Sequence, residues 1–164
     1  MNDRLKTIID LEKYPIHDLY SPIIRNLVKK CKYELERYSC STIPNFILPK
    51  SLKVMNLELE KQLDEVYMSK ESINAYLYAK DDLSLPKDHP KRTFMNRYNG
   101  YLNSDCFPKD SEMKYLYETE ELLKFVSACL GVSPIYRWAD PLACHAYNVM
   151  KPDGVLPWHF DSCE

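Results

Sequence analysis

The chain has 164 residues and a mass of 19.4 kDa, the size of one domain with a buried core; 45% of its residues are hydrophobic and 28% are charged. This composition does not suggest an intrinsically disordered chain, and no apolar run approaches the roughly 18 residues that span a bilayer, so no membrane association is expected. The formal net charge of −2 leaves no basic excess for holding phosphates, so nucleic acid is not an expected partner either.

The cysteine pattern and the N-terminus indicate a reducing, cytoplasmic setting. The segment "MNDRLKTIIDLEK" is too charged for a secretory signal. No C-x-x-C pair is present, and the six cysteines are scattered along the chain: Cys31, Cys40, Cys106, Cys129, Cys144 and Cys163.

The first half of the chain is mostly helical in pattern. Ser21 and Pro22 are a good N-cap and first residue for an amphipathic helix over 21–38. The stretch "CSTIPNFIL", broken by Pro44, predicts a short edge strand or an extended connector. A second helix is predicted over 49–68, because apolar residues recur there on one stripe: Leu52, Met55, Leu59, Leu63 and Val66.

The second half changes character. Residues 73–79 alternate as in a strand, a long polar loop is expected over 80–110, and Thr119 and Gly131 bound a third helix. Its expected buried residues are Leu122, Leu123, Val126 and Leu130. Strands are then expected in "PIYRW", "CHAYNVM" and "VLPWHF", the last two joined by a "KPDG" turn. We expect one α+β domain, with a helical support region over 1–72 and a β-rich core over 73–164.

The segment "HFD" near the end of the sequence is a candidate metal site. In a strand, residues i and i+2 point to the same face, so His159 and Asp161 would aim at one point while Phe160 turns away. One imidazole and one carboxylate are two-thirds of the 2-His-1-carboxylate triad that binds non-haem iron(II) and leaves positions open. The other interpretation is a histidine merely oriented by a neighbouring aspartate.

The surrounding sequence extends the motif. The stretch "YRWADPLACHAYNVMKPDGVLPWHFDSCE" and the loop "DDLSLPKDHPKR" resemble the iron(II)/2-oxoglutarate-dependent oxygenases, in the group of free-amino-acid hydroxylases and related radical halogenases. Members of that group tend to carry a "YR-x-x-DPL" element, an "N-V" strand, a Gly-containing turn and "WHFD". The resemblance covers about residues 73–164, and it implies a double-stranded β-helix, a cupin-like jelly roll.

The resemblance implies a function and cofactors. His159 and Asp161 match the first two metal ligands, for Fe(II) with 2-oxoglutarate as co-substrate. The halogenases of this group replace the carboxylate with a small residue, so Asp161 favours hydroxylation. The expected substrate is a small amino-acid-like molecule.

Other side chains are weaker candidates. Asn148 is a candidate for a hydrogen bond to 2-oxoglutarate or substrate, or else a polar residue facing a wet interior. Among arginines, which pair bidentately with carboxylates, Arg92 is the candidate for the substrate, whereas Arg137 is expected to be structural and Arg97 stays open. Trp158 is expected either to line the site or to belong to the core.

The chain stops early relative to the family resembled. There, the second His ligand and the arginine that holds 2-oxoglutarate follow the H-x-D motif, so His145 is not an expected ligand and both groups would lie beyond Glu164. The jelly roll would be incomplete, with an open sheet edge that a dimer or partner chain could cover. We expect a fragment or truncated product that is inactive alone; the alternative is a non-catalytic, degenerate oxygenase-like binding module.

Overall fold

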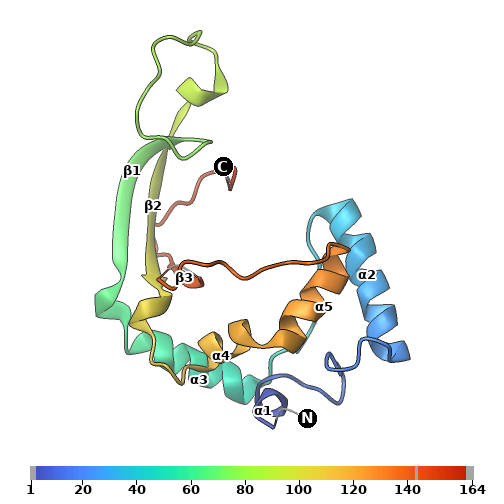
Figure 1. Ribbon diagram of the computed structural model, residues 1–164. Helices are drawn as coiled ribbons and strands as arrows, with labels where there is room; N and C mark the ends of the chain where they lie inside the picture. The colour runs from blue at the N-terminus through green and yellow to red at the C-terminus, as the bar shows by residue number, and fades with distance from the viewer. Residues whose placement is uncertain (1–2, 143, 162–164) are drawn as a thin grey trace. The chain divides into compact units, whose positions relative to one another are not determined.

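The computed structural model describes residues 3–142 and 144–161 and shows an α+β protein (Figure 1). The helices are α1 (Leu5–Ile8), α2 (Pro22–Tyr38), α3 (Pro49–Glu60), α4 (Glu112–Glu118) and α5 (Glu120–Leu130). The strands are β1 (Tyr67–Asn74), β2 (Phe94–Asn103) and β3 (Ala146–Val149), and short 3₁₀ turns cover Leu63–Glu65, Pro90–Arg92 and Ser104–Cys106.

The chain forms two compact units that do not follow the order of the sequence. Unit 1 comprises residues 1–62 and 103–145 and holds all five helices, whereas unit 2 comprises residues 63–102 and 146–164 and holds most of the sheet, in each case within the described residues. The chain passes between them after residues 62, 102 and 145. Helices α4 and α5 therefore join the N-terminal helices, although the sequence places them among the expected strands.

Helix α2 has the ends that its sequence predicts. The Oγ atom of Ser21 accepts a hydrogen bond from the backbone N–H of Ile24 at 3.3 Å, and Pro22 takes the first turn, where no N–H is needed. Ser39, the residue that follows the helix, adopts the left-handed conformation with φ 58°. Gly131 follows α5 in the same conformation with φ 71°, where glycine carries no steric penalty. Both predicted helices are confirmed.

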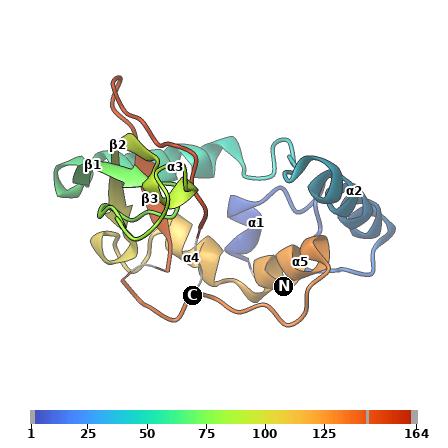
Figure 2. The same ribbon diagram turned by 90° about the horizontal axis from the view of Figure 1, so that it is seen from above.

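The core of unit 1 is built from α1, the segment after it and the facing sides of α2, α3, α4 and α5, with α2 packed against α5 (Figure 2). Cys31 of α2 and Cys129 of α5 are buried there, and the ring of Phe46 stacks on that of Phe125 with centroids 5.9 Å apart. The prediction that Val126 would be buried is wrong, as it is for Leu130: Val126 is 36% exposed and Leu130 51%. The buried residues of α5 are instead Phe125 and Cys129, each one position before the residue predicted to be buried.

Helix α3 is shorter than predicted. It ends at Glu60, and strand β1 begins at Tyr67, inside the region expected to be helical. Only Met55 of the predicted stripe is fully buried, while Leu52 and Leu63 are about half exposed. Pairing of this segment with β2 outweighs its helical periodicity, since burial and pairing commonly override local propensity.

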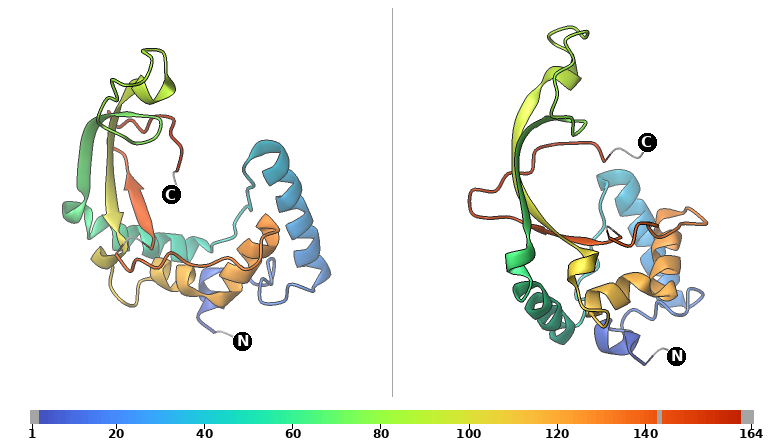
Figure 3. Two further views of the ribbon diagram at one scale, coloured as in Figure 1. Left: turned by 45° about the horizontal axis from the view of Figure 1, so that its top comes forward. Right: turned by 60° about the vertical axis from the view of Figure 1, so that its left-hand side comes forward.

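The sheet of unit 2 has the order β1-β2-β3 (Figure 3). Strands β1 and β2 pair in antiparallel fashion from Tyr67 opposite Tyr101 to Asn74 opposite Phe94. The prediction of one long loop over 80–110 is therefore wrong, because β2 lies inside it. Gly100 fits against Met68, where a Cβ atom would lie 2.6 Å from the Met68 sulfur.

Two further expectations concern the remaining segments. The expected strand in "PIYRW" is not formed, and residues 135–138 carry no regular structure. The "KPDG" turn is confirmed, because the N–H of Gly154 donates to the carbonyl of Lys151 at 2.8 Å. No described helix combines the length and the apolar character needed to cross a membrane.

Candidate metal centre

The segment that carries the H-x-D motif is held to the sheet at two points. Val155 and Tyr98 exchange backbone hydrogen bonds of 2.7 Å in both directions, which places the segment beside β2. Further on, the N–H of Phe160 donates to the carbonyl of Ala75 at 2.8 Å, and its ring lies 5.2 Å from that of Tyr76. The predicted strand "VLPWHF" is thus formed only as a bridge at Val155, because Pro157 has no N–H with which to continue a ladder.

The ring of His159 is oriented by the backbone. Its Nδ1 atom lies 2.8 Å from the carbonyl oxygen of Pro157, which can only accept a hydrogen bond, so Nδ1 carries the proton. This fixes the tautomer of the neutral ring and leaves Nε2 with its lone pair. Metal-binding histidines are commonly held in this way, with the second nitrogen donating to a backbone carbonyl.

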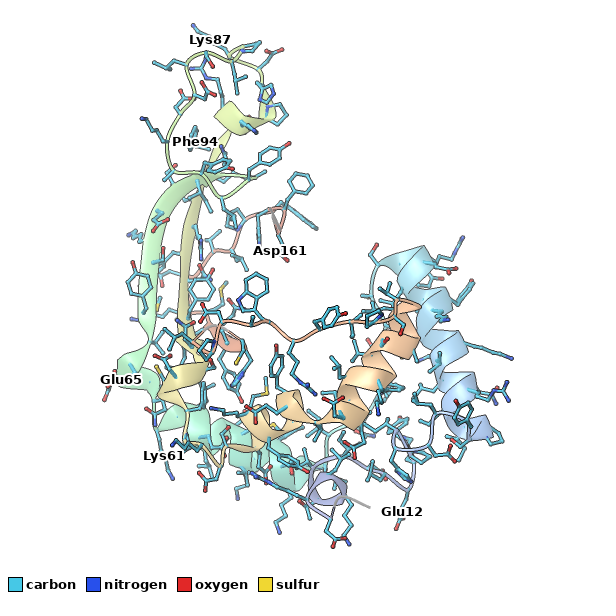
Figure 4. All side chains as sticks on the ribbon, viewed as in Figure 1. Glu12, Lys61, Glu65, Lys87, Phe94 and Asp161 are labelled. Atoms are coloured by element: carbon cyan, nitrogen blue, oxygen red, sulfur yellow. The ribbon has the colours of Figure 1, made fainter. Side chains whose placement is uncertain are left out.

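Asp161 lies next to this free nitrogen. Its Oδ1 atom is 3.3 Å from Nε2 of His159, so the structure brings the two predicted ligands together. The histidine side chain is 24% exposed and the aspartate 94%, and both line a shallow hollow of about 360 Å³. In Figure 4, Asp161 lies toward the end of the β1–β2 hairpin marked by Phe94, away from Glu65.

The spacing of the two donor atoms suits a shared metal ion. Two ligands bound at about 2.1 Å and at right angles are about 3 Å apart, close to the observed separation. In residues 3–142 and 144–161, no group of three or more His, Cys, Asp or Glu side chains is placed to hold a metal. Within this part of the chain, the candidate centre therefore consists of two candidate ligands, His159 and Asp161.

Trp158 and Asn148 both face solvent. The Trp158 side chain lines the same hollow as His159 but is 92% exposed, so it forms a wall of the hollow and not part of a core. Asn148 is exposed on β3, and its side chain forms no hydrogen bond with the described residues.

Arg92 is engaged by its own loop. Its Nε and Nη2 atoms donate to the two carboxylate oxygens of Asp81 at 2.9 Å each, and Nη1 donates to the carbonyl of Leu85. The hydrogen bond from Arg92 lowers the pKa of Asp81 below its ordinary value. A substrate carboxylate at this arginine would have to replace Asp81, while Arg97 is occupied on β2 by a 2.7 Å hydrogen bond to Asn99.

Arg137 has the structural environment expected of it. In unit 1 its Nε atom donates to the carbonyl of Tyr117 at 3.1 Å, and Nη1 pairs with Glu120 at 2.7 Å. These contacts tie the segment after α5 back to the helices.

His145 belongs to unit 1 and is buried between the rings of Phe107 and Tyr117, whose centroids lie 6.0 and 5.4 Å away. Burial, together with the positive charge of Lys114, lowers the pKa of this imidazole, and Glu118 opposes the shift. Its Nε2 atom has no hydrogen-bond partner among the described residues. The neutral ring is therefore favoured by packing.

Two residues that support the centre are absent from the sequence-based prediction. Ala75 and Tyr76 anchor Phe160, between the two ligands, and Tyr76 in turn lies under the ammonium group of Lys91 at 5.4 Å from its ring centroid. The strand predicted over 73–79 is wrong for these residues, because β1 ends at Asn74 and Ala75 and Tyr76 lie in the turn after it. No sequence signal connects this turn with a segment about 85 positions later.

Comparison with known proteins gives no relative: no protein-family model matches the chain, and no curated protein and no solved structure matches it.

Proposed function

We propose that His159 and Asp161 are two ligands of a non-haem iron(II) centre in a 2-oxoglutarate-dependent hydroxylase. The observation that supports this most directly is the orientation of the His159 ring, with Nδ1 held by Pro157 and Nε2 turned toward Asp161 at 3.3 Å. The sequence resemblance supports the reaction class, and under this proposal the sheet of unit 2 is the start of a jelly roll.

The iron would supply the activation of dioxygen. The overall reaction then balances as substrate C–H plus oxygen plus 2-oxoglutarate giving substrate C–OH plus succinate plus carbon dioxide. Asp161 supplies a carboxylate at the position where halogenases of the resembled group have a small residue, so hydroxylation is the proposed outcome.

The protein's other side chains would bind and orient the organic molecules. We propose a small amino-acid-like substrate lying along the exposed face of Trp158, which offers an apolar wall beside the ligands. Asn148 offers an exposed amide on β3 that forms no hydrogen bond with the described residues. A role for Arg92 requires that a substrate carboxylate take the place of Asp81 in the bidentate pair.

A non-catalytic binding module is the competing proposal. The openness of the centre favours it, because Asp161 is 94% exposed and the described residues provide two ligands. Such a site would bind a divalent ion weakly and would not exclude water from it. The hydroxylase proposal requires conversion of 2-oxoglutarate to succinate, whereas the binding module would not convert it.

The deciding experiment is an anaerobic titration of the 164-residue chain with Fe(II) and 2-oxoglutarate, followed by exposure to oxygen with a panel of free amino acids. We expect the chain alone to bind Fe(II) weakly and to release little succinate, and any succinate formed to disappear in Asp161→Asn. Metal binding that persists unchanged in both Asp161→Asn and His159→Gln would overturn the proposed centre. Binding of Fe(II) with no more succinate than Asp161→Asn releases would favour the binding module.

A further inference from the structure

Unit 1 contains a hollow that is separate from the H-x-D segment. It lies between α2, α5 and the segment 131–135, and its volume is about 570 Å³, within the range of pockets that bind small molecules. Half-buried aliphatic side chains form its floor: Leu19, Val28, Leu123 and Ile135. An apolar body of a ligand would be removed from water on this floor.

The charge at the rim of this hollow is positive. Lys32 of α2 and Lys124 of α5 both line it, and neither forms a salt bridge with a described residue. The carboxylate of Glu120, which also lines the hollow, is paired with Arg137 at 2.7 Å. Because Arg137 balances the charge of Glu120, the ammonium groups of Lys32 and Lys124 give the rim a net positive charge above the apolar floor.

The position of Lys32 strengthens this pattern. Its Nζ atom lies 3.5 Å from the place that a Cβ atom would take on Gly131, at the C-terminal end of α5. The ammonium group is therefore turned across from α2 toward α5 and the hollow.

We propose that this hollow binds a small amphipathic anion, a carboxylate with an aliphatic body. The carboxylate would lie between Lys32 and Lys124, and the hydrocarbon would cover Leu123 and its apolar neighbours. The inference rests on the apolar floor and on Lys32 and Lys124, which form no salt bridge with the described residues, and it does not depend on the proposed iron centre.

The test uses octanoate as the probe, with octan-1-ol and octylamine as neutral and cationic analogues. Calorimetry of the full chain should show octanoate binding at least tenfold more tightly than either analogue, and weakening as salt is raised. In ¹H–¹⁵N spectra, the shifted amides should lie in α2, α5 and 131–135. Equal binding of octanoate and octanol, or shifts confined to other segments, would overturn the proposal.

Matched variants separate the charge from the fold. Lys32→Gln with Lys124→Gln should raise the octanoate Kd at least tenfold, whereas Lys29→Gln with Lys53→Gln, two exposed lysines outside the hollow, should leave it unchanged. Val132→Glu places a carboxylate at an exposed lining position and should also abolish binding. Circular dichroism checks that each variant is folded; a folded lysine double variant that binds like the parent chain contradicts the proposal.

Discussion

The Nε2 atom of His159 faces the Oδ1 atom of Asp161 at 3.3 Å, while the other ring nitrogen is committed to the carbonyl of Pro157. When the ring is neutral, the lone pair of Nε2 faces a carboxylate oxygen. Both atoms are hydrogen-bond acceptors, so this arrangement is unfavourable. It becomes favourable when a positive charge lies at Nε2, either a proton or a metal ion bound by both atoms. The pair is therefore suited to capture a cation.

Metal capture by this pair can be measured directly. Adding Mn(II), a paramagnetic ion, to the 164-residue chain should broaden the amide signals of residues 158–161 and of Ala75 and Tyr76, which contact Phe160. Asp161→Asn should weaken the binding by more than about tenfold, since even outer-shell partners of a metal ligand are worth 10- to 100-fold. Asp153→Asn, on the preceding exposed turn, is the matched control and should bind as the parent does. Broadening that is equal in both variants would refute a chelating pair.

The bidentate pair of Arg92 and Asp81 should hold the loop over residues 81–92. Arg92→Lys keeps the charge but loses the two-pronged geometry, so we expect faster amide hydrogen exchange in residues 82–89. Lys87→Gln, in the same loop, should not change the exchange rates. The pKa of Asp81 is lowered in the folded chain, so the pair stabilises the loop above the ordinary aspartate pKa, and this contribution is lost as the pH falls through the lowered value. Unchanged protection in Arg92→Lys at neutral pH would show that the bidentate geometry of Arg92 and Asp81 does not hold the loop.

The helices predicted most accurately, α2 and α5, are those with clear capping residues in the sequence. Ser21 and Pro22 begin one, and Gly131 ends the other, and these signals act within a single turn of chain. Strand β2 went unrecognised because "FMNRYNGYLN" has no clean alternation and contains asparagine and glycine, which are depleted in strands. Its formation depends on β1, a partner that local patterns do not reveal.

The candidate centre divides in the same way. His159 and Asp161 lie close together as predicted, but the regular strand assumed for them is not formed, so the i, i+2 spacing in a strand is not the cause of their contact. The sequence does not predict that Arg92 pairs with Asp81. An arginine that binds a carboxylate of the chain cannot be distinguished in the sequence from one that binds a carboxylate of a ligand.

Burial of His145 should make the stability of the chain sensitive to mild acid. Its pKa is lowered in the folded state, so the unfolded chain takes up a proton first as the pH falls below about 6.5, the ordinary histidine value. The free energy of unfolding, measured by urea denaturation, should therefore decrease from pH 7.5 to pH 5. His145→Gln should flatten this dependence, whereas His17→Gln, at an exposed position, should not. Parallel pH profiles for the parent and His145→Gln would show that this imidazole does not contribute.

Cys129 should react with alkylating agents much more slowly than Cys40. Burial, with the adjacent thiol of Cys31, raises the pKa of Cys129 to about 12. Because alkylation needs the thiolate, iodoacetamide at pH 8 should modify exposed Cys40 quickly. Cys129 should be modified only after the chain unfolds.

The same raised pKa predicts a loss of stability in alkaline solution. An unfolded cysteine ionises near pH 9, whereas folded Cys129 stays protonated to about pH 12, so the stabilisation is complete below pH 9 and is lost as the pH rises through this interval. Cys129→Ala should therefore lose less stability than the parent between pH 8.5 and pH 10.5, although its lower stability at neutral pH reflects the cavity left between α2 and α5. Cys40→Ala is the matched control, because removing an exposed thiol leaves the core intact, and its pH profile should follow that of the parent. Mass spectrometry of peptides after timed alkylation provides the second measurement: if Cys129 in the folded chain were modified as fast as Cys40, the thiol would not be buried in the core as the structure places it.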